Sequence, residues 1–407
     1  MRYLGPGILL AGAAIGGSHL VASTQAGAHY GWSLLGILFL VNLFKYPFFR
    51  YGQRYTAATG ESILQGYMRL GRPYLVLFFV LNLVAGIANI AGVSMITGSL
   101  ATNLGIGGIS IPTWSALFMA SSVLVIIFGG FGLLRRIGKL VVAVLGLSTI
   151  VAMVISLVNG PVAEPGYVGE SPWTTASFGF VIMFMGWMPA PIESSVWPSL
   201  WMKSQEKLRK QAAVMRETMI DFHVGYYASV ILAFVFLVLG KMVMYGSGTE
   251  LSAQGTVFAR QLIDLYSETI GHWARPLIIL AALSAMVSTT LTTIDAYPRS
   301  LTHTTTLLFD PLLTHYRKVQ YFWLLSGITG AYLLIRFFVD QLGDMLTVAM
   351  TTSFLSSPLF AYINYRVMAL DVVPDQYRPK AWERFLSLTG IAFLTGFGII
   401  FVYHVFF

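Results

Sequence analysis

Apolar residues in this sequence form long, nearly unbroken runs that are separated by short polar segments. A run such as VVAVLGLSTIVAMVISLV (141–158) approaches the ~20 residues that an α-helix needs to cross a hydrocarbon core of about 30 Å. It lacks the alternation of polar and apolar residues that is typical of a strand in a transmembrane barrel. The pattern therefore predicts an all-α polytopic membrane protein.

The runs predict eleven transmembrane helices, with ends placed to within about two to four residues. The segment 250–272 has the pattern of an amphipathic surface helix, and a polar loop is the alternative. The predicted transmembrane helices are 7–29, 32–51, 74–101, 113–132, 138–159, 174–201, 219–243, 274–297, 319–339, 344–367 and 384–405.

Lysine and arginine residues collect on one side of this predicted topology. With the N-terminus in the cytoplasm, 20 of them lie on the inner side and four on the outer side, while Lys45 lies within a helix. Because basic segments stay in the cytoplasm, we expect a cytoplasmic N-terminus. The odd number of helices then places the C-terminus outside.

Composition agrees with this interpretation. Hydrophobic residues make up 56% of the 407 residues and charged residues only 10%, against about 25% in a soluble domain. The net charge of +8 comes from the loops, so we expect no nucleic-acid partner. The chain has no cysteine, which excludes disulfides and thiolate metal sites. We expect an integral protein of a bacterial inner (plasma) membrane, surrounded by lipid, with no cofactor and no obligate protein partner.

Two predicted helices contain breaks near their middle. The first contains GGSH (16–19), and adjacent glycines weaken a helix. The sixth contains WMPAPIE (187–193), whose prolines lack N–H donors and clash with the preceding turn. Freed backbone groups cannot face lipid, so the breaks are predicted to face a substrate. Close helix packing is the alternative role of the glycine pair.

The two breaks lie five helices apart, which is typical of secondary transporters with two inverted five-helix repeats. We therefore expect a first repeat at 1–159, an outer loop at 160–173, a second repeat at 174–367, and an additional eleventh helix at 368–407. Alternating access through the two breaks would follow from this organisation.

Four motifs, in this order and spacing, indicate a family: GPG (5–7), QAGAHYGW (25–32), VNLFKYPFFRYGQRYTAATG (41–60) and WMP (187–189). The chain resembles the Nramp family of proton-coupled divalent-metal transporters. The resemblance implies a LeuT-like fold of eleven or twelve helices. It also implies a divalent metal ion as the transported substrate.

The sequence departs from the family at the residues that carry its chemistry. Where the family has Asp-Pro-Gly-Asn, with two oxygen ligands, this chain has GGSH (16–19). Met188 stands at the thioether ligand, but Ala190 replaces the histidine of Met-Pro-His. Asn89 and Gly92 stand where the family has acids linked to proton movement. We therefore expect a remodelled metal site with weak or no proton coupling.

Several polar groups could replace the lost ligands. Glu193 is the only carboxylate near either break, and it could contact the ion directly or through water, carry a proton, or pair with Lys45. His19 is either a transition-metal ligand or a hydrogen-bonded core residue. Met188 is either a soft ligand or a packing residue. Lys45 either faces the cavity, where its charge opposes a dication, or extends to the interface.

The candidate site follows from these alternatives. We predict that substrate binding involves Gly16, Gly17, Ser18, His19, Trp187, Met188, Ala190 and Glu193, with Glu193, Met188 and His19 as candidate metal ligands and Lys45 and Asn89 as candidate coupling or gating residues.

Three functions remain open at this point. The first is alternating-access transport of a divalent cation of the Mn, Fe or Mg class. The second is transport of a small organic solute or anion by a LeuT-fold protein, because a glycine-rich break also exposes amide groups that suit a carboxylate. The third is a membrane sensor or enzyme. We expect no enzyme, since the sequence has no H-E-x-x-H, nucleophile elbow or phosphate loop.

Overall fold

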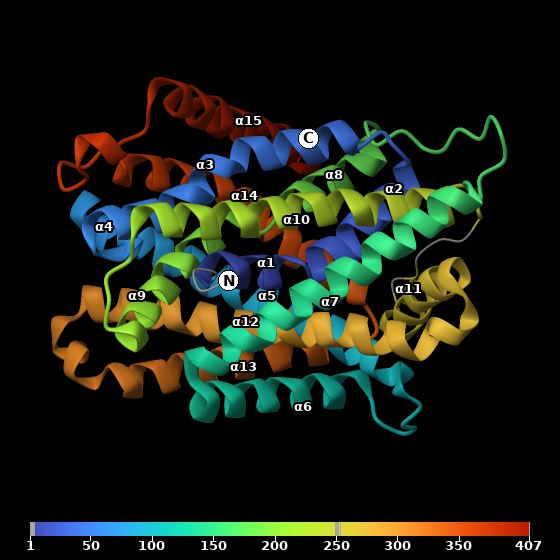
Figure 1. The fold of residues 1–407 in the computed structure, drawn as a ribbon, viewed down its shortest axis with the longest axis horizontal. Coiled ribbons are helices and arrows are strands. Elements are labelled where there is room, and N and C mark those ends of the chain that lie inside the picture. Colours follow the sequence, from blue (N-terminus) through green and yellow to red (C-terminus); the bar gives the residue numbers. More distant parts are fainter. Residues whose placement is uncertain (1–4, 249–251, 253, 407) are drawn as a thin grey trace.

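The regular structure is helical throughout the described part of the chain, which is residues 5–248, 252 and 254–406 of a computed structural model (Figure 1). This confirms the all-α prediction. The α-helices are α1 (Pro6–Ala14), α2 (Thr24–Tyr30), α3 (Leu35–Thr59), α4 (Ile63–Leu70), α5 (Arg72–Ala101), α6 (Ile111–Leu124), α7 (Gly130–Asn159), α8 (Thr175–Trp187), α9 (Trp197–Arg209), α10 (Met215–Val243), α11 (Gly255–Ile270), α12 (Arg275–Leu308), α13 (Tyr316–Phe337), α14 (Leu342–Val367) and α15 (Ala381–Phe406).

Eight helical segments among the described residues are long and apolar enough to cross a membrane. The helices α3, α7 and α13 lie at the three other predicted spans, and the count of eleven crossings stays a prediction. The eight segments are Pro6–Tyr30, Arg72–Leu104, Ile111–Gly129, Thr175–Arg209, Met215–Val243, Arg275–Leu308, Leu342–Val367 and Ala381–His404.

The structure can be compared with the sequence-based predictions at two further segments, 250–272 and 133–137. The segment 250–272, predicted as an amphipathic helix, contains helix α11, which buries Phe258, Leu262 and Tyr266, so a helix rather than a loop is confirmed there; residues 250, 251 and 253 lie outside the described residues. The expected loop at 133–137 is helical instead. A π-helix, η3 (Val125–Gly129), joins α6 to α7, and the chain turns without leaving helical geometry (Figure 1). The wider turn of a π-helix allows such a change of direction.

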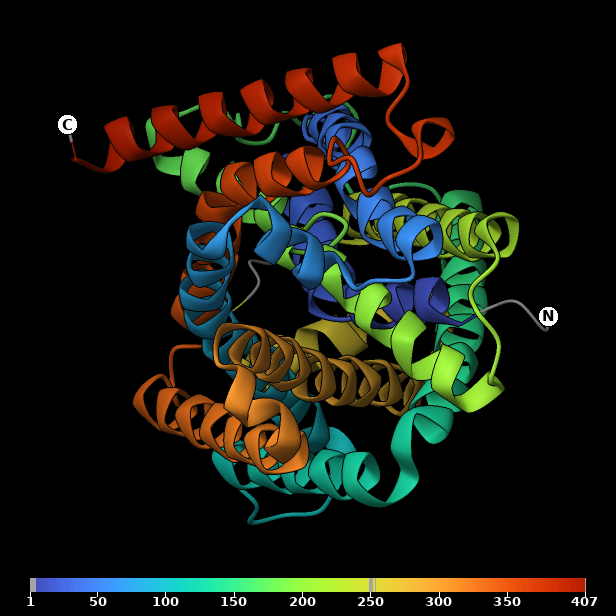
Figure 2. The ribbon, with the colours of Figure 1, turned by 90° about the vertical axis from the view of Figure 1, so that its left-hand side faces the viewer.

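The first span runs through the middle of the bundle, as both ribbon views show (Figures 1 and 2). Its most apolar stretch is entirely buried, whereas α15 and α6 lie at the periphery and bury 17% and 22% of theirs. A span surrounded by protein can contain irregular backbone, because neighbouring helices rather than lipid meet its polar groups.

Glycine residues allow the first span to contact α10 closely. A Cβ atom at Gly225 would lie 2.1 Å from the carbonyl oxygen of Gly7, and one at Gly27 would lie 2.0 Å from that of Leu237. Small residues at such crossings let two membrane helices approach backbone to backbone. The two contacts lie near opposite ends of the first span and fix its position against α10.

A carboxylate strengthens the same contact at the start of the first span. Asp221 of α10 accepts hydrogen bonds from the backbone N–H groups of Gly5 (2.8 Å) and Gly7 (2.6 Å). These amides belong to the positive end of α1, where a negative charge is favourable. The GPG motif is therefore held by a side chain more than 200 residues away in the sequence.

We expect Gly225→Ala to lower the melting temperature of the purified protein in detergent. The added methyl group meets a backbone carbonyl that cannot rotate away, and overpacking of this kind costs roughly 1–3 kcal/mol. Gly179→Ala in α8 is the matched control, because a Cβ atom there meets nothing within 4 Å. A melting temperature equal to that of the control would contradict the close crossing of α1 and α10.

Candidate functional site

The first break lies at Ile15 and Gly16. Helix α1 ends at Ala14, and Gly16 (φ −114°, ψ −116°) precedes a π-helix, η1 (Gly17–Ser23). A Cβ atom at Gly16 would lie 2.1 Å from Oγ1 of Thr289 in α12. The helix is therefore interrupted here, and the glycine backbone also packs closely against α12.

The second break lies between α8 and a short 3₁₀ helix, η4 (Ile192–Val196). Met188 has an extended backbone, and Pro189, Ala190 and Pro191 separate the two helical segments. The Ser18 hydroxyl lies 3.3 Å from the carbonyl oxygen of Pro189, within donating distance. The two breaks therefore touch each other inside the bundle.

A small cavity of about 30 Å³ lies between the breaks. A buried water needs ~10–15 Å³ of such space, so the cavity has room for about two waters or one small ion. Its polar lining is mostly hydroxyl and amide groups. The cavity is lined by Ala13, Ala14, Gly17, Ser18, Asn89, Val93, Trp187, Ala190, Pro191, Trp197, Thr289, Thr293 and Tyr297.

Glu193 is completely buried and is not itself a lining residue of this cavity, but its hydrogen-bond partner Tyr297 is. The Glu193 Oε1 accepts hydrogen bonds from Tyr297 (3.2 Å) and Ser353 (3.3 Å). Asn89, which lines the cavity, donates in turn to Ser353 (3.1 Å). The other carboxylate oxygen, Oε2, has no hydrogen-bond partner among the residues that the structure describes. A buried carboxylate oxygen without a partner is costly, so this atom is suited to bind a cation or a water molecule.

Lys45 reaches the second break from α3. Its ammonium group is completely buried and donates to the carbonyl oxygens of Met185 (2.6 Å), Gly186 (2.9 Å) and Ala190 (3.3 Å). It does not extend to the interface. No ion pair within 4.0 Å joins it to Glu193 among the ion pairs of the described residues.

His19 has partners for both ring nitrogens. Nε2 lies 2.8 Å from the carbonyl oxygen of Ser229 in α10, and Nδ1 lies 2.7 Å from the Ser18 hydroxyl. A carbonyl oxygen only accepts, so Nε2 carries the proton and the neutral ring directs its lone pair at Ser18. The ring also meets the edge of Phe236. These contacts match the core alternative and leave no nitrogen free in this conformation.

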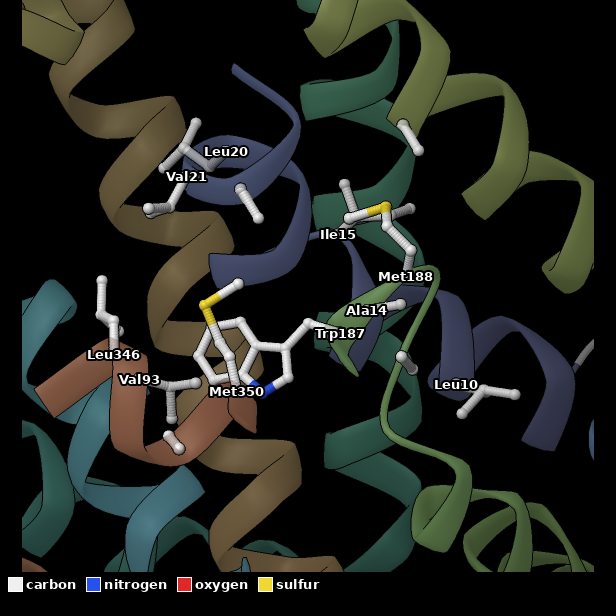
Figure 3. Close-up of a cluster of buried hydrophobic side chains, with 14 of the residues drawn as sticks. Leu10, Ala14, Ile15, Leu20, Val21, Val93, Trp187, Met188, Leu346 and Met350 are labelled. Carbon is white, nitrogen blue, oxygen red and sulfur yellow. The ribbon is translucent and has the colours of Figure 1, made fainter. Parts of the chain in front are cut away.

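Trp187 and Met188 point in different directions from adjacent positions (Figure 3). The Trp187 ring lies toward Met350 and Val93 and lines the cavity. Met188 lies beside Ile15, and its sulfur accepts a hydrogen bond from Ser23 (3.4 Å). Trp187 therefore shapes the cavity, while the thioether is engaged with the first span.

Sequence reasoning missed several polar groups of the site. They are Thr289 and Thr293 of the cavity lining, and Tyr297 and Ser353, which hold Glu193. A signal was present for the threonines, because STTLTT (288–293) interrupts an otherwise apolar helix with side chains spaced four apart. Asp295 and Arg299, one turn apart in α12, form an ion pair.

The site contains no conventional metal centre. Within the described residues, no group of three or more His, Cys, Asp or Glu side chains is placed to hold a metal ion. Any cation bound here would depend on Glu193 together with neutral oxygen atoms.

The sequence matches the family model of natural resistance-associated macrophage protein-like (Nramp) proteins over residues 7–404. The chain belongs to the Nramp family. It is also 40% identical over 405 residues to an uncharacterized protein of Pasteurella multocida, a match that covers 98% of this chain and 91% of that protein. Both matches span nearly the whole chain of this Nramp protein.

Solved transporter structures share the fold. A manganese transporter of Eremococcus coleocola superposes with a TM-score of 0.66 at 13% identity, covering 98% of this chain and 85% of that one. MhsT in complex with L-phenylalanine gives a TM-score of 0.63 at 13% identity, covering 98% of both chains. At such identities the likeness establishes the LeuT-type fold, and the substrate must be argued from the site.

We expect His19→Ala to lower the melting temperature while leaving metal affinity unchanged. The substitution removes two buried hydrogen bonds, each with a net contribution of about 1 kcal/mol, and leaves a cavity beside Phe236. His272→Ala, at an exposed position, is the control. A variant of normal stability with metal affinity reduced tenfold or more, measured by calorimetry, would instead identify His19 as a ligand.

Proposed function

We propose that this protein is a secondary transporter that moves a divalent metal cation of the Mn, Fe or Mg class by alternating access between the two helix breaks. The family assignment supports metal-ion transport in general. The choice of a divalent cation depends mainly on Glu193. This carboxylate is buried, accepts a hydrogen bond from the cavity-lining Tyr297 and keeps one oxygen without a partner among the described residues.

The cavity supports an inorganic substrate rather than an organic one. A space of about 30 Å³ accepts an ion with a water molecule but not an amino acid. Hard cations prefer oxygen ligands, and the lining offers the hydroxyl groups of Ser18, Thr289 and Thr293. The cavity leaves room for about one water beside an ion, so oxygen atoms of the protein would supply most of the ligands.

Weak or absent proton coupling is part of the proposal. Asn89 stands in the third span where the family has an acid, and an amide cannot carry a proton at ordinary pH. Glu193 is the carboxylate that accepts a hydrogen bond from the cavity-lining Tyr297, and we assign it to the ion. Metal flux would then follow the metal gradient alone.

The proposal includes the wider organisation of the chain. Eleven crossings, inverted repeats at 1–159 and 174–367, and a cytoplasmic N-terminus with an outer C-terminus agree with the helix order and with the distribution of basic residues. A bacterial inner membrane is the proposed location.

We expect Glu193→Gln to reduce metal uptake to background in proteoliposomes loaded with a metal-sensitive dye. The amide has nearly the same shape, but it cannot neutralise a dication. Glu164→Gln, in the exposed outer loop, is the matched control and is expected to transport normally. Mn²⁺, Mg²⁺ and Fe²⁺ are tested in parallel, because the site does not distinguish them by ligand type.

Two outcomes would count against this assignment. Normal uptake by folded Glu193→Gln would remove the carboxylate from the site. If none of the three ions enters while an amino acid or carboxylic acid does, the organic-solute alternative is correct.

We also expect the liposome interior to keep its pH during metal uptake. A pH-sensitive dye enclosed with the metal indicator measures both fluxes in one sample. The expected result is metal entry without acidification, since no proton carrier is assigned at the third span. Internal acidification in proportion to metal entry would show that proton coupling survives.

A further inference from the structure

The Lys45 ammonium group is held in the manner of a bound ion. It donates to three carbonyl oxygens at 2.6, 2.9 and 3.3 Å and is completely buried. An ammonium group has three N–H donors and no acceptor, so three carbonyls use its full bonding capacity. The three oxygens come from the backbone of the second break and converge on one point.

These carbonyls are available because α8 ends at the break. The last four carbonyl groups of a helix have no partner within the helix. The Met188 N–H donates a hydrogen bond to the carbonyl of Phe184. The Lys45 ammonium group donates to the next two carbonyls, those of Met185 and Gly186. The carbonyl of Ala190 lies in the unwound segment. A helix C-terminus carries a partial negative charge, so this cluster of three carbonyl oxygens favours a cation whether or not Lys45 is present.

Glu193 does not account for the position of Lys45. Its Oε1 is held by Tyr297 and Ser353, and its Oε2 makes no hydrogen bond to the ammonium group. The two charges influence each other through the break, but each is held by its own partners. The carbonyl cluster is therefore a site separate from the carboxylate.

We propose that the carbonyl oxygens of Met185, Gly186 and Ala190 form a monovalent-cation site that the chain fills with its own Lys45 ammonium group. Lys45 takes the place of a dissolved ion and supplies a positive charge to the broken helix. Ammonium and potassium ions have similar radii, so the vacated site would accept NH₄⁺ or K⁺ in preference to the smaller Na⁺.

The first test measures binding without transport. Lys45→Met keeps most of the side-chain stem and leaves a space the size of the ammonium head, while Lys45→Ala opens a larger space. We expect the melting temperature of either variant to rise by several degrees when KCl or NH₄Cl replaces the chloride salt of N-methylglucamine, a cation too large to enter. NaCl is expected to have a smaller effect. Wild-type protein and the control Lys241→Ala should show no such difference.

The outcomes of this test are clear. A cation-dependent rise in the Lys45 variants, absent from the wild type, supports the site. Equal melting temperatures in all four salts would overturn it, and so would an equal rise in the wild type. If neither variant folds in any of the salts, the carbonyls do not accept a dissolved ion and the proposal fails.

A second test depends on the proposed metal transport. Metal uptake by the wild type should be indifferent to K⁺ and NH₄⁺, whereas uptake by Lys45→Met should require one of them and rise at least tenfold on its addition. Wild-type liposomes that admit no metal would count against the transport proposal alone. Folded Lys45→Met with unchanged uptake in N-methylglucamine would overturn the tethered cation as a functional element.

Discussion

A helix that breaks inside a membrane exposes carbonyl groups to which lipid offers no hydrogen bond, and each unpaired group costs several kcal/mol. Much of the site can be understood from that constraint. At the first break, the Thr289 hydroxyl lies within hydrogen-bonding distance of the Gly12 carbonyl of α1. At the second break, Lys45 binds carbonyls of α8. Burying an ammonium group is itself unfavourable, and three charge-assisted hydrogen bonds at a helix C-terminus offset that cost.

The same constraint explains why the first span lies in the centre of the bundle. Irregular backbone is tolerated only where protein surrounds it, and glycine contacts with α10 bring protein within backbone distance. Asp221 fixes the start of the span, and the Ser18–Pro189 contact joins the two breaks. The contacts with α10 therefore affect the site. A shift of α10 would move the first span and separate the groups that hydrogen-bond to the backbone of the broken helices.

The fold could largely be predicted from the sequence, because the signals that define it are local. Long apolar runs define helices, and the glycine and proline residues at 16–17, 189 and 191 mark where two of them break. The partners of the site depend on tertiary structure. Ser353 lies 160 residues from Glu193, and nothing near either residue in the sequence indicates their contact.

The orientation of side chains within the break was also beyond local prediction. A π-helix inserts an extra residue per turn, which rotates the following side chains relative to an α-helix. Residues in η1 consequently face directions that α-helical periodicity does not predict, and His19 turns toward Ser229 of α10. The hydrogen-bond partners of Lys45 could not be predicted from the local sequence either. Its position in α3 is plain in the sequence, but its partners exist only because α8 ends opposite it.

Charge balance sets the character of the substrate site. Lys45 and Glu193 are groups of opposite charge near the break, so under the proposed function a dication would meet several neutral dipoles of the cavity and the Glu193 oxygen that has no partner among the described residues. In the low dielectric of the bundle, a dication with so little compensation must keep part of its hydration shell. Retained water weakens binding, and weak binding favours rapid release to the other side. The loss of the family's acidic ligand and the buried ammonium group both fit the proposed transport, in which ion affinity would be low and the metal gradient would drive flux.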